Sequence, residues 1–314
     1  MSTDPTTSTT AASADGAARA AGTVDLAGRA VARVGYGMMP LLRLASDDAG
    51  TASAVELLRR AAELGVEVYD TAQFYGDGLA NRLLARAFAG SRDEVLYVTK
   101  VGARPDHGGP APMTAAQRPE ELRAAVEANL EALRTDHVDG VLMRRMDMLP
   151  GLIAEGDQQV PLDEQLDALE DMRREGLLRF IGLSHVSVGQ LDAAVAAGHE
   201  IAAVSNFYNL LRRDDEALAE RSASVGAAWM PYFPLGGRAV FPGIASVLDD
   251  EALLAVARET GATPNQVGLA WILAHCPTGL VISGTTSVAH LEQNVACASV
   301  RLSDEQLARL DARA

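Results

Sequence analysis

Three residues in the first third of the chain, Asp70, Tyr75 and Lys100, are of the types that acid–base chemistry needs. Asp70 and Lys100 each end a short apolar segment of β-type, and Tyr75 follows Asp70 by five positions. Ends of adjacent parallel strands lie about 4.8 Å apart, so an aspartate and a lysine placed there can form an ion pair. A nearby ammonium lowers the pKa of a phenol, which can then protonate a developing alkoxide. A purely structural ion pair beside an ordinary loop tyrosine is the alternative, and spacing alone does not separate the two.

Lysine usage singles out one of these residues. Of the 27 basic residues, Lys100 is the one lysine and the rest are arginine. Arginine serves as well as lysine on a solvated face, whereas a compact ammonium with an adjustable pKa is something that guanidinium cannot supply. Unless the distribution of lysine and arginine arose by chance, it indicates a site that requires lysine at position 100.

Strand-like segments recur along the chain and must place these side chains. Most are apolar throughout, as expected for parallel strands that are covered on both faces. Their mean spacing of about 35 residues suits a repeated strand–helix unit. The segments begin near Val34, Val66, Val95, Val138, Phe180, Ala202, Ala227 and Leu280.

Helical signals fill the intervals. Apolar residues recur at helical spacing after Pro119, at Leu122, Val126, Leu130 and Leu133. Capping boxes predict helices that open at residues 263 and 303, and an extra helix is expected over residues 249–259. Two short β-type segments, 23–26 and 30–33, predict a hairpin ahead of the first barrel strand.

This order of elements predicts an α/β protein with a closed (β/α)8 TIM barrel, an N-terminal β-hairpin and extra C-terminal helices. We expect a disordered tail over residues 1–23 and a single domain over residues 24–314. A doubly wound open sheet is the alternative. It is weakened because Gly35 and Gly37 match the first two glycines of a dinucleotide fingerprint, but Pro40 stands where the third belongs.

Composition excludes several classes of partner. The chain has 314 residues, 48% of them hydrophobic, and a net charge of −15. Nucleic acids and anionic membranes both require basic surfaces, so we expect neither as a partner. No apolar run approaches the ~20 residues that a membrane span needs. Two cysteines, Cys276 and Cys297, fit a reducing cytoplasm, and the histidine spacing gives no sign of a metal site.

Several motifs together resemble the aldo-keto reductase superfamily. They are GVEVYDTAQFYG at 65–76, VTKVG at 98–102, GLS at 182–184, FPLG at 233–236, and GTTS at 284–287 with Asn294 beyond it. The similarity extends from about residue 24 to the C-terminus and is strongest to the bacterial pyridoxal-reductase-like branch. It implies a barrel that reduces small aldehydes or ketones with NADP(H) and without a metal.

The resemblance also implies roles for individual residues. Tyr75 is expected to donate the proton, with Lys100 and Asp70 tuning it. Tyr232 is expected to stack on the nicotinamide ring, and the segment 284–294 to bind the adenosine end. The full set expected to bind the cofactor is Ser184, His185, Ser205, Tyr232, Phe233, Leu235, Gly236, Gly284, Thr285, Thr286, Ser287, His290, Gln293 and Asn294.

Three positions depart from the family pattern. Arg144 stands where most of the family has a histidine. The pyridoxal-reductase-like branch also has an arginine at this position. Such an arginine can polarise a carbonyl or hold an anionic substrate. His185 and Ser205 stand where an asparagine and a glutamine usually bind the nicotinamide amide. A barrel with an altered nicotinamide site, which binds a metabolite for regulation or catalyses a non-redox rearrangement, is therefore the alternative function. The oligomeric state is not predicted, and Arg212 and Arg213 are expected on a solvated face.

Overall fold

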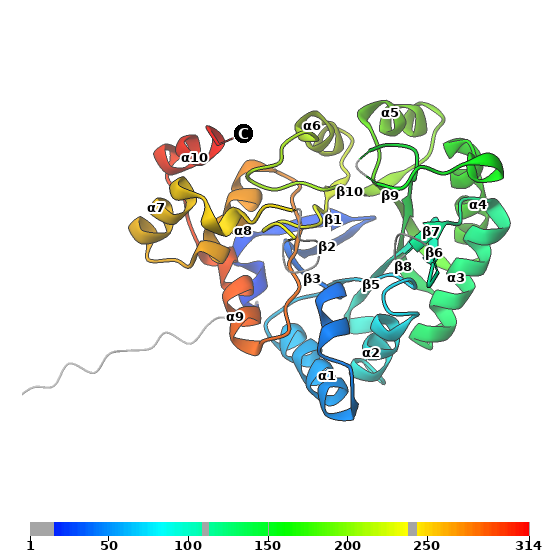
Figure 1. Cartoon of the computed structure of the whole chain (residues 1–314), viewed down its shortest axis with the longest axis horizontal. Coiled ribbons are helices and arrows are strands. Elements are labelled where there is room, and N and C mark those ends of the chain that lie inside the picture. Colours follow the sequence, from blue (N-terminus) through cyan, green and yellow to red (C-terminus); the bar gives the residue numbers. More distant parts are fainter. Residues whose placement is uncertain (1–15, 109–112, 150, 238–243, 314) are drawn as a thin grey trace, which may run out of the picture.

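A computed structural model describes residues 16–108, 113–149, 151–237 and 244–313 of the chain, and shows a ring of helices around a central sheet (Figure 1). Eight parallel strands form the sheet in the order β11-β10-β9-β8-β5-β4-β3-β12. They are β3 (Val34–Gly37), β4 (Val68–Asp70), β5 (Leu96–Val101), β8 (Val138–Arg144), β9 (Leu178–Ser184), β10 (Ile201–Ser205), β11 (Ala228–Trp229) and β12 (Val281–Ile282). Every strand-like segment predicted from the sequence is present.

Backbone hydrogen bonds at Trp229 join the two edges of this sheet. The Trp229 amide donates to the carbonyl of Thr278 at 3.0 Å, and the Leu280 amide donates to the carbonyl of Trp229 at 2.8 Å. The sheet is thereby closed, which confirms the predicted (β/α)8 barrel and excludes the open sheet.

Helices cover the outside of the barrel in the expected alternation (Figure 1). After their strands come α1 (Asp48–Glu63), α2 (Leu79–Ala87), α3 (Pro119–Leu133), α4 (Leu162–Arg174), α5 (Val188–Ala196), α6 (Glu216–Ser224), α8 (Pro264–His275) and α9 (Val288–Ala296). The additional helices α7 (Glu251–Thr260) and α10 (Asp304–Asp311) lie near the C-terminus, as predicted. In the part of the chain that the structure describes, no helix has the length and apolar character to cross a bilayer.

Local sequence signals explain how these helices begin. Thr263 and Ser303 each accept a hydrogen bond from the backbone of a glutamine three positions on, whose side chain bonds back to the cap. The apolar residues that were predicted to recur along α3 face the core, and Leu122 and Val126 are fully buried. The caps satisfy backbone donors that a helix cannot pair internally.

An N-terminal hairpin, β1 (Thr23–Leu26) and β2 (Arg29–Ala32), closes one end of the barrel. Its turn needs left-handed backbone at Ala27 (φ 50°) and Gly28 (φ 86°). Val24, Leu26 and Val31 pack with barrel-interior residues that include Leu96, near the start of β5. The opposite end, where the strands finish, is therefore the end available for a site.

The predicted tail boundary at residue 23 is wrong. Residues 17–21 form a short 3₁₀ helix in which Ala18 is fully buried. Arg19 donates hydrogen bonds of 2.8 Å to both carboxylate oxygens of Glu67. Alanine-rich composition concealed this packing, because alanine is compatible with both a tail and a close contact. Residues 1–15 of that tail lie outside the described residues.

Candidate active site

Asp70 and Lys100 form a buried ion pair at the ends of adjacent strands. Asp70 is the last residue of β4, Lys100 lies in β5, and both are 4% exposed. The Lys100 ammonium donates to both Asp70 carboxylate oxygens at 2.7 Å and to the Thr71 carbonyl at 3.1 Å. Burial lowers the pKa of Lys100, but Asp70 and Tyr75 together raise it further, so that the net shift is upward. The lysine is therefore held as an ammonium.

Tyr75 lies beside this ammonium, in the loop between β4 and α2. The Lys100 nitrogen is 5.1 Å from the centre of the Tyr75 ring, and its charge and hydrogen bond favour the phenolate. Burial nevertheless outweighs these effects and raises the pKa of Tyr75 above its ordinary 10.0. The expectation of a lowered pKa is thus wrong in sign, because desolvation is invisible in residue spacing. Tyr75 is a protonated phenol at neutral pH, with an ammonium to stabilise the anion that proton transfer leaves.

A buried ladder of polar side chains supports the loop that carries Tyr75. The Thr71 hydroxyl donates to Asn81 Oδ1 at 2.7 Å, and the Asn81 amide donates to Asn129 Oδ1 at 2.8 Å and to Gln73 at 2.9 Å. The Thr99 hydroxyl also donates to Asn129 Oδ1, at 2.6 Å. The ladder ties the residues next to Asp70 and Lys100 to helices α2 and α3, and the sequence analysis did not identify it.

Arg144 is the last residue of β8. Its charge acts on the hydroxyls of Tyr75 and Tyr232, and it hydrogen-bonds the latter. Its buried Nε has no hydrogen-bond partner in the structure. The Gln117 side chain, another residue that the sequence analysis missed, donates to the Arg144 carbonyl at 2.8 Å. Arg144 is thus anchored through its backbone, with a guanidinium N–H left for a ligand.

His185 connects two parts of the site. One ring nitrogen, Nδ1, lies 3.2 Å from the Tyr232 hydroxyl, and the other, Nε2, lies 2.9 Å from the Met148 carbonyl. Burial and the nearby Arg144 lower the pKa of His185 below 6.5, although the Met148 contact opposes them. The imidazole is therefore neutral, and both of its nitrogens already have partners from the protein itself.

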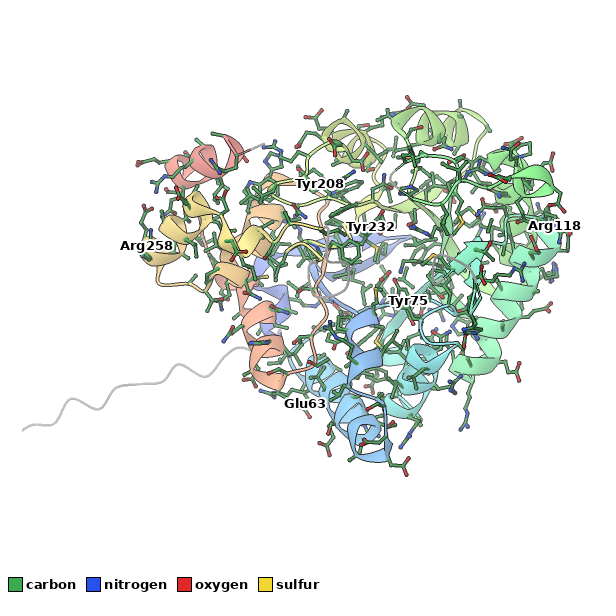
Figure 2. The ribbon with its side chains drawn as sticks, in the orientation of Figure 1. Glu63, Tyr75, Arg118, Tyr208, Tyr232 and Arg258 are labelled. Atoms are coloured by element: carbon green, nitrogen blue, oxygen red, sulfur yellow. The ribbon has the colours of Figure 1, made fainter. Side chains whose placement is uncertain are left out.

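Tyr75 and Tyr232 both lie over the middle of the barrel, whereas Arg258 and Glu63 lie at its periphery (Figure 2). Tyr232 stacks on Phe207 with ring centres 5.8 Å apart. Phe207, Met148 and His185 also line a cleft of about 170 Å³. An aromatic wall thus adjoins the polar groups at the strand ends.

Comparison with known proteins places this site in a family. The sequence matches the aldo/keto reductase family over residues 33–314. The chain belongs to the aldo-keto reductase family. It is 39% identical over 291 residues to pyridoxine 4-dehydrogenase of Escherichia coli, covering 92% of this chain and 97% of that protein. It is 31% identical to an uncharacterized oxidoreductase of Schizosaccharomyces pombe, covering 97% and 94%.

Solved aldo-keto reductases share the fold. A structure from Klebsiella pneumoniae, in complex with NADP and acetate, superposes with a TM-score of 0.74 at 29% identity, covering 92% of this chain and 94% of that one. This aldo-keto reductase is accordingly an oxidoreductase built on a (β/α)8 barrel, and the family resemblance drawn from its motifs is confirmed.

Unpaired polar atoms at the strand ends fit a polar ligand such as a nicotinamide amide. Ser184 and Ser205 pair in register at the ends of β9 and β10, and both hydroxyls are buried without a hydrogen-bond partner. The Asn294 amide donates to Ser283 at 3.2 Å, while its Oδ1 is also buried and unpartnered. Buried polar atoms are rarely left unpaired, so these three residues are suited to binding a further group.

The segment that follows β12 approaches β3 very closely. A Cβ atom on Gly284 would lie 2.0 Å from the Gly37 carbonyl, so only glycine fits there. The Tyr36 hydroxyl donates to the Thr285 carbonyl, and Ser287 caps α9 by accepting from the His290 amide at 3.5 Å. The start of α9, where Thr286 and His290 are exposed, offers helix N–H groups to an anion such as a phosphate.

The loop after β11 also needs unusual backbone. Phe233 has a φ of 55° and Gly236 a φ of 88°. A Cβ atom on Gly236 would lie 2.2 Å from the Ala245 carbonyl. Phe233, Leu235 and Gly236 therefore form a tight turn beside Tyr232, next to residues 238–243, which lie outside the described residues.

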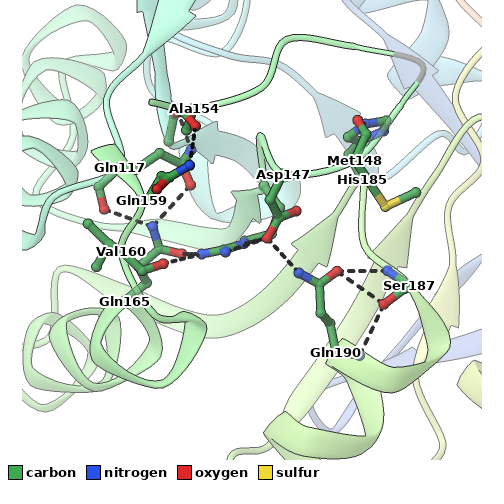
Figure 3. A network of polar contacts seen from close by, with 12 residues as sticks. Gln117, Asp147, Met148, Ala154, Gln159, Val160, Gln165, His185, Ser187 and Gln190 are labelled. Carbon is green, nitrogen blue, oxygen red and sulfur yellow. Dashed lines mark hydrogen bonds and ion pairs between the residues drawn. The ribbon is translucent and has the colours of Figure 1, made fainter. Parts of the chain in front are cut away.

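A polar network that sequence analysis did not identify fixes the loop between β8 and α4 (Figure 3). Arg145 binds Asp147 through Nε at 2.9 Å and also contacts the side chain of Gln165. Gln165 in turn donates to the Gln117 carbonyl at 2.7 Å, and Gln190 donates to Asp147 at 2.8 Å. The partners lie up to 48 residues apart, so no local pattern could have revealed them.

The expectation of a solvated arginine pair at 212 and 213 is wrong. Arg213 is 15% exposed and binds Glu216 at 2.6 Å. Arg212 lies 4.5 Å above the Phe207 ring, at the edge of the cleft. Arg213 also donates to the Asp311 carbonyl at 2.9 Å, 98 residues further along the chain, and such a distant partner cannot be read from a local charge pattern.

Proposed function

We propose that this aldo-keto reductase uses NADPH to reduce a small aldehyde or ketone to the alcohol, with an aromatic aldehyde of the pyridoxal type as substrate. The convergence of Tyr75, Lys100 and Asp70 at the carboxyl ends of β4 and β5 is the observation that carries this proposal. The naming of the E. coli relative as pyridoxine 4-dehydrogenase supports the substrate class.

Each of these side chains has a separate task in the proposed reaction. When bound, NADPH supplies a hydride to the carbonyl carbon. Tyr75 donates its proton to the carbonyl oxygen, which becomes the alcohol hydroxyl. Lys100 stabilises the resulting phenolate, and Asp70 holds Lys100 in place as an ammonium despite its burial. Arg144 places a permanent positive charge near the oxygen on which negative charge develops.

The cofactor assignments follow the unpaired atoms and the shape of the site. Ser184, Ser205 and Asn294 supply the buried polar atoms without partners, and Tyr232 supplies a flat ring. The segment 284–294, with Thr285, Thr286, Ser287, His290 and Gln293, is assigned to the adenosine and phosphate end, and the turn at Phe233, Leu235 and Gly236 to the phosphates between the two ends. His185 stays in the proposed set as the residue that positions Tyr232. Both of its ring nitrogens already have partners, so it is not assigned a hydrogen bond to the cofactor.

Titration with NADPH tests the proposal directly. We expect micromolar binding, seen as a change in nicotinamide fluorescence, and consumption of NADPH with a panel of aromatic aldehydes. Absence of binding at millimolar NADPH would overturn the proposal and favour a barrel without redox activity. NADH in the same titration shows whether His290 suffices for a preference for the phosphorylated cofactor.

A further inference from the structure

Arg144 is the one cation of the Tyr75 site without a matching anion among the described residues. Lys100 is neutralised by Asp70, at 2.7 Å. Arg145, the next residue, binds Asp147 and Gln165. Arg144 forms no ion pair with any described residue, and its Nε is buried and unpartnered.

The carboxylates around the site are already engaged elsewhere. Asp70 binds Lys100, and Asp147 accepts hydrogen bonds from Arg145 and from Gln190. Asp215, which lines the same cleft as His185 and whose charge acts on His185 and Tyr232, accepts from Asn206 at 3.0 Å. Arg144 is partly buried, and a partly buried guanidinium without an anion loses some of its hydration with no charge to compensate. An anionic ligand group would offset that cost.

We propose that Arg144 binds an ionised oxygen next to the reacting carbonyl, so that the preferred substrates are 2-hydroxyaryl aldehydes and 2-oxo acids. This proposal rests on the reductase function proposed above and specifies its substrate. A guanidinium presents several N–H donors in one plane, which suits two neighbouring oxygens of one ligand. In a chain with a net charge of −15, a local cation is also what allows an anionic substrate to bind at all.

A role for Arg144 in polarising the carbonyl alone predicts different kinetics from a role in binding an oxyanion. If the guanidinium only polarises the carbonyl, its removal slows every substrate by the same factor. If it binds a neighbouring oxyanion, its removal slows the anionic substrate much more than its neutral analogue. The ratio of the two kcat/KM values, compared between enzymes, separates the two roles and cancels the intrinsic reactivity of each aldehyde.

The experiment measures kcat/KM for 2-hydroxybenzaldehyde against 2-methoxybenzaldehyde, in buffer above the pKa of the substrate phenol so that it is ionised, and for phenylglyoxylate against its methyl ester, in the wild type and in Arg144→Gln. We expect the preference for the anionic member to fall at least tenfold in Arg144→Gln and to be largely kept in Arg144→Lys. Arg174→Gln, which removes an arginine that is 70% exposed on α4, serves as the control and keeps the wild-type ratio. An unchanged ratio in Arg144→Gln would overturn the proposal while leaving the reductase function standing.

A binding measurement keeps the test independent of turnover. Calorimetric titration of the protein with phenylglyoxylate is expected to show binding that weakens at least tenfold in Arg144→Gln, with the methyl ester bound equally weakly by both. Circular dichroism confirms that the variant is folded. If the wild type neither binds NADPH nor reduces any of these carbonyls, the proposed reductase function fails; if phenylglyoxylate still binds through Arg144, the anion site survives that failure.

Discussion

The Tyr232 hydroxyl lies 3.2 Å from Nδ1 of His185, whose other nitrogen lies 2.9 Å from the Met148 carbonyl. A carbonyl can only accept, so the Nε2 atom carries the ring proton and Nδ1 accepts from Tyr232. Arg144 in turn donates to the Tyr232 oxygen. These contacts run in one direction from Arg144 to the Met148 carbonyl. They join the aromatic wall of the site to the loop between β8 and α4.

Replacement of His185 by asparagine tests this connection. His185 has a φ of 59°, which asparagine also tolerates, so the backbone is preserved while the bridge to Met148 is lost. We expect the free energy of unfolding to fall by about 1 kcal/mol and KM for the aldehyde to rise several-fold with little change in kcat. Urea unfolding and steady-state kinetics measure these effects, and His107→Asn, at a position 78% exposed, serves as the control. An unaltered KM would show that the bridge does not position the loop.

Tyr75→Phe removes the proposed proton donor and little else. We expect turnover to fall by roughly 10²- to 10⁴-fold, the usual contribution of a positioned general acid, while NADPH binds as before. Fluorescence titration and single-turnover kinetics distinguish the two properties. The matched control is Tyr97→Phe, which removes a buried hydroxyl bound to the Leu84 carbonyl at 3.4 Å and is expected to retain turnover. Near-normal turnover in Tyr75→Phe would remove Tyr75 from the role.

The raised pKa of Tyr75 predicts the pH dependence of reduction. Burial raises this pKa above 10.0 against the opposing charges of Lys100 and Arg144, and the protonated phenol is the active form. Where proton donation limits the reaction, we therefore expect the rate of reduction to stay level through neutral pH. It should decline only above about pH 10. The dependence of kcat/KM on pH measures it, with circular dichroism at each pH to exclude unfolding. A decline centred near pH 8 would show that the ammonium outweighs burial.

The barrel and the Asp70–Lys100 pair were predictable because they depend on periodicity and on the geometry of strand ends. The sign of the Tyr75 pKa shift was not, since it depends on how far the folded chain excludes water from the phenol. Gln117 and Asn129 were missed because their partners are distant in sequence and amides carry no charge pattern. Arg144 and His185 stood out as departures from the family, but the contacts that explain them required coordinates.

Asn129 offers a test of the ladder beneath the Tyr75 loop. Asn129→Ala leaves the Thr99 hydroxyl and the Asn81 amide without their shared acceptor, at an expected cost of about 2 kcal/mol of unfolding free energy. Because Asn81 also bonds to Thr71, we expect kcat to fall more than the affinity for NADPH. Urea unfolding, kinetics and cofactor titration measure these effects. Glu127→Ala, at an exposed position on the same helix, is the control; a kcat equal to that of this control would make the ladder purely structural.

Lys100→Met separates the catalytic from the structural contribution of the ion pair. The single change leaves the Asp70 carboxylate buried, 4% exposed and without its cation, and such a loss typically costs about 3–5 kcal/mol. Adding Asp70→Asn removes the uncompensated charge, so the double variant is expected to recover much of the stability. It should recover no turnover, because nothing then stabilises the Tyr75 phenolate. Urea unfolding and turnover of both variants make the comparison. If the double variant regained both stability and turnover, Lys100 would be a structural partner of Asp70 and the ammonium would have no part in proton transfer.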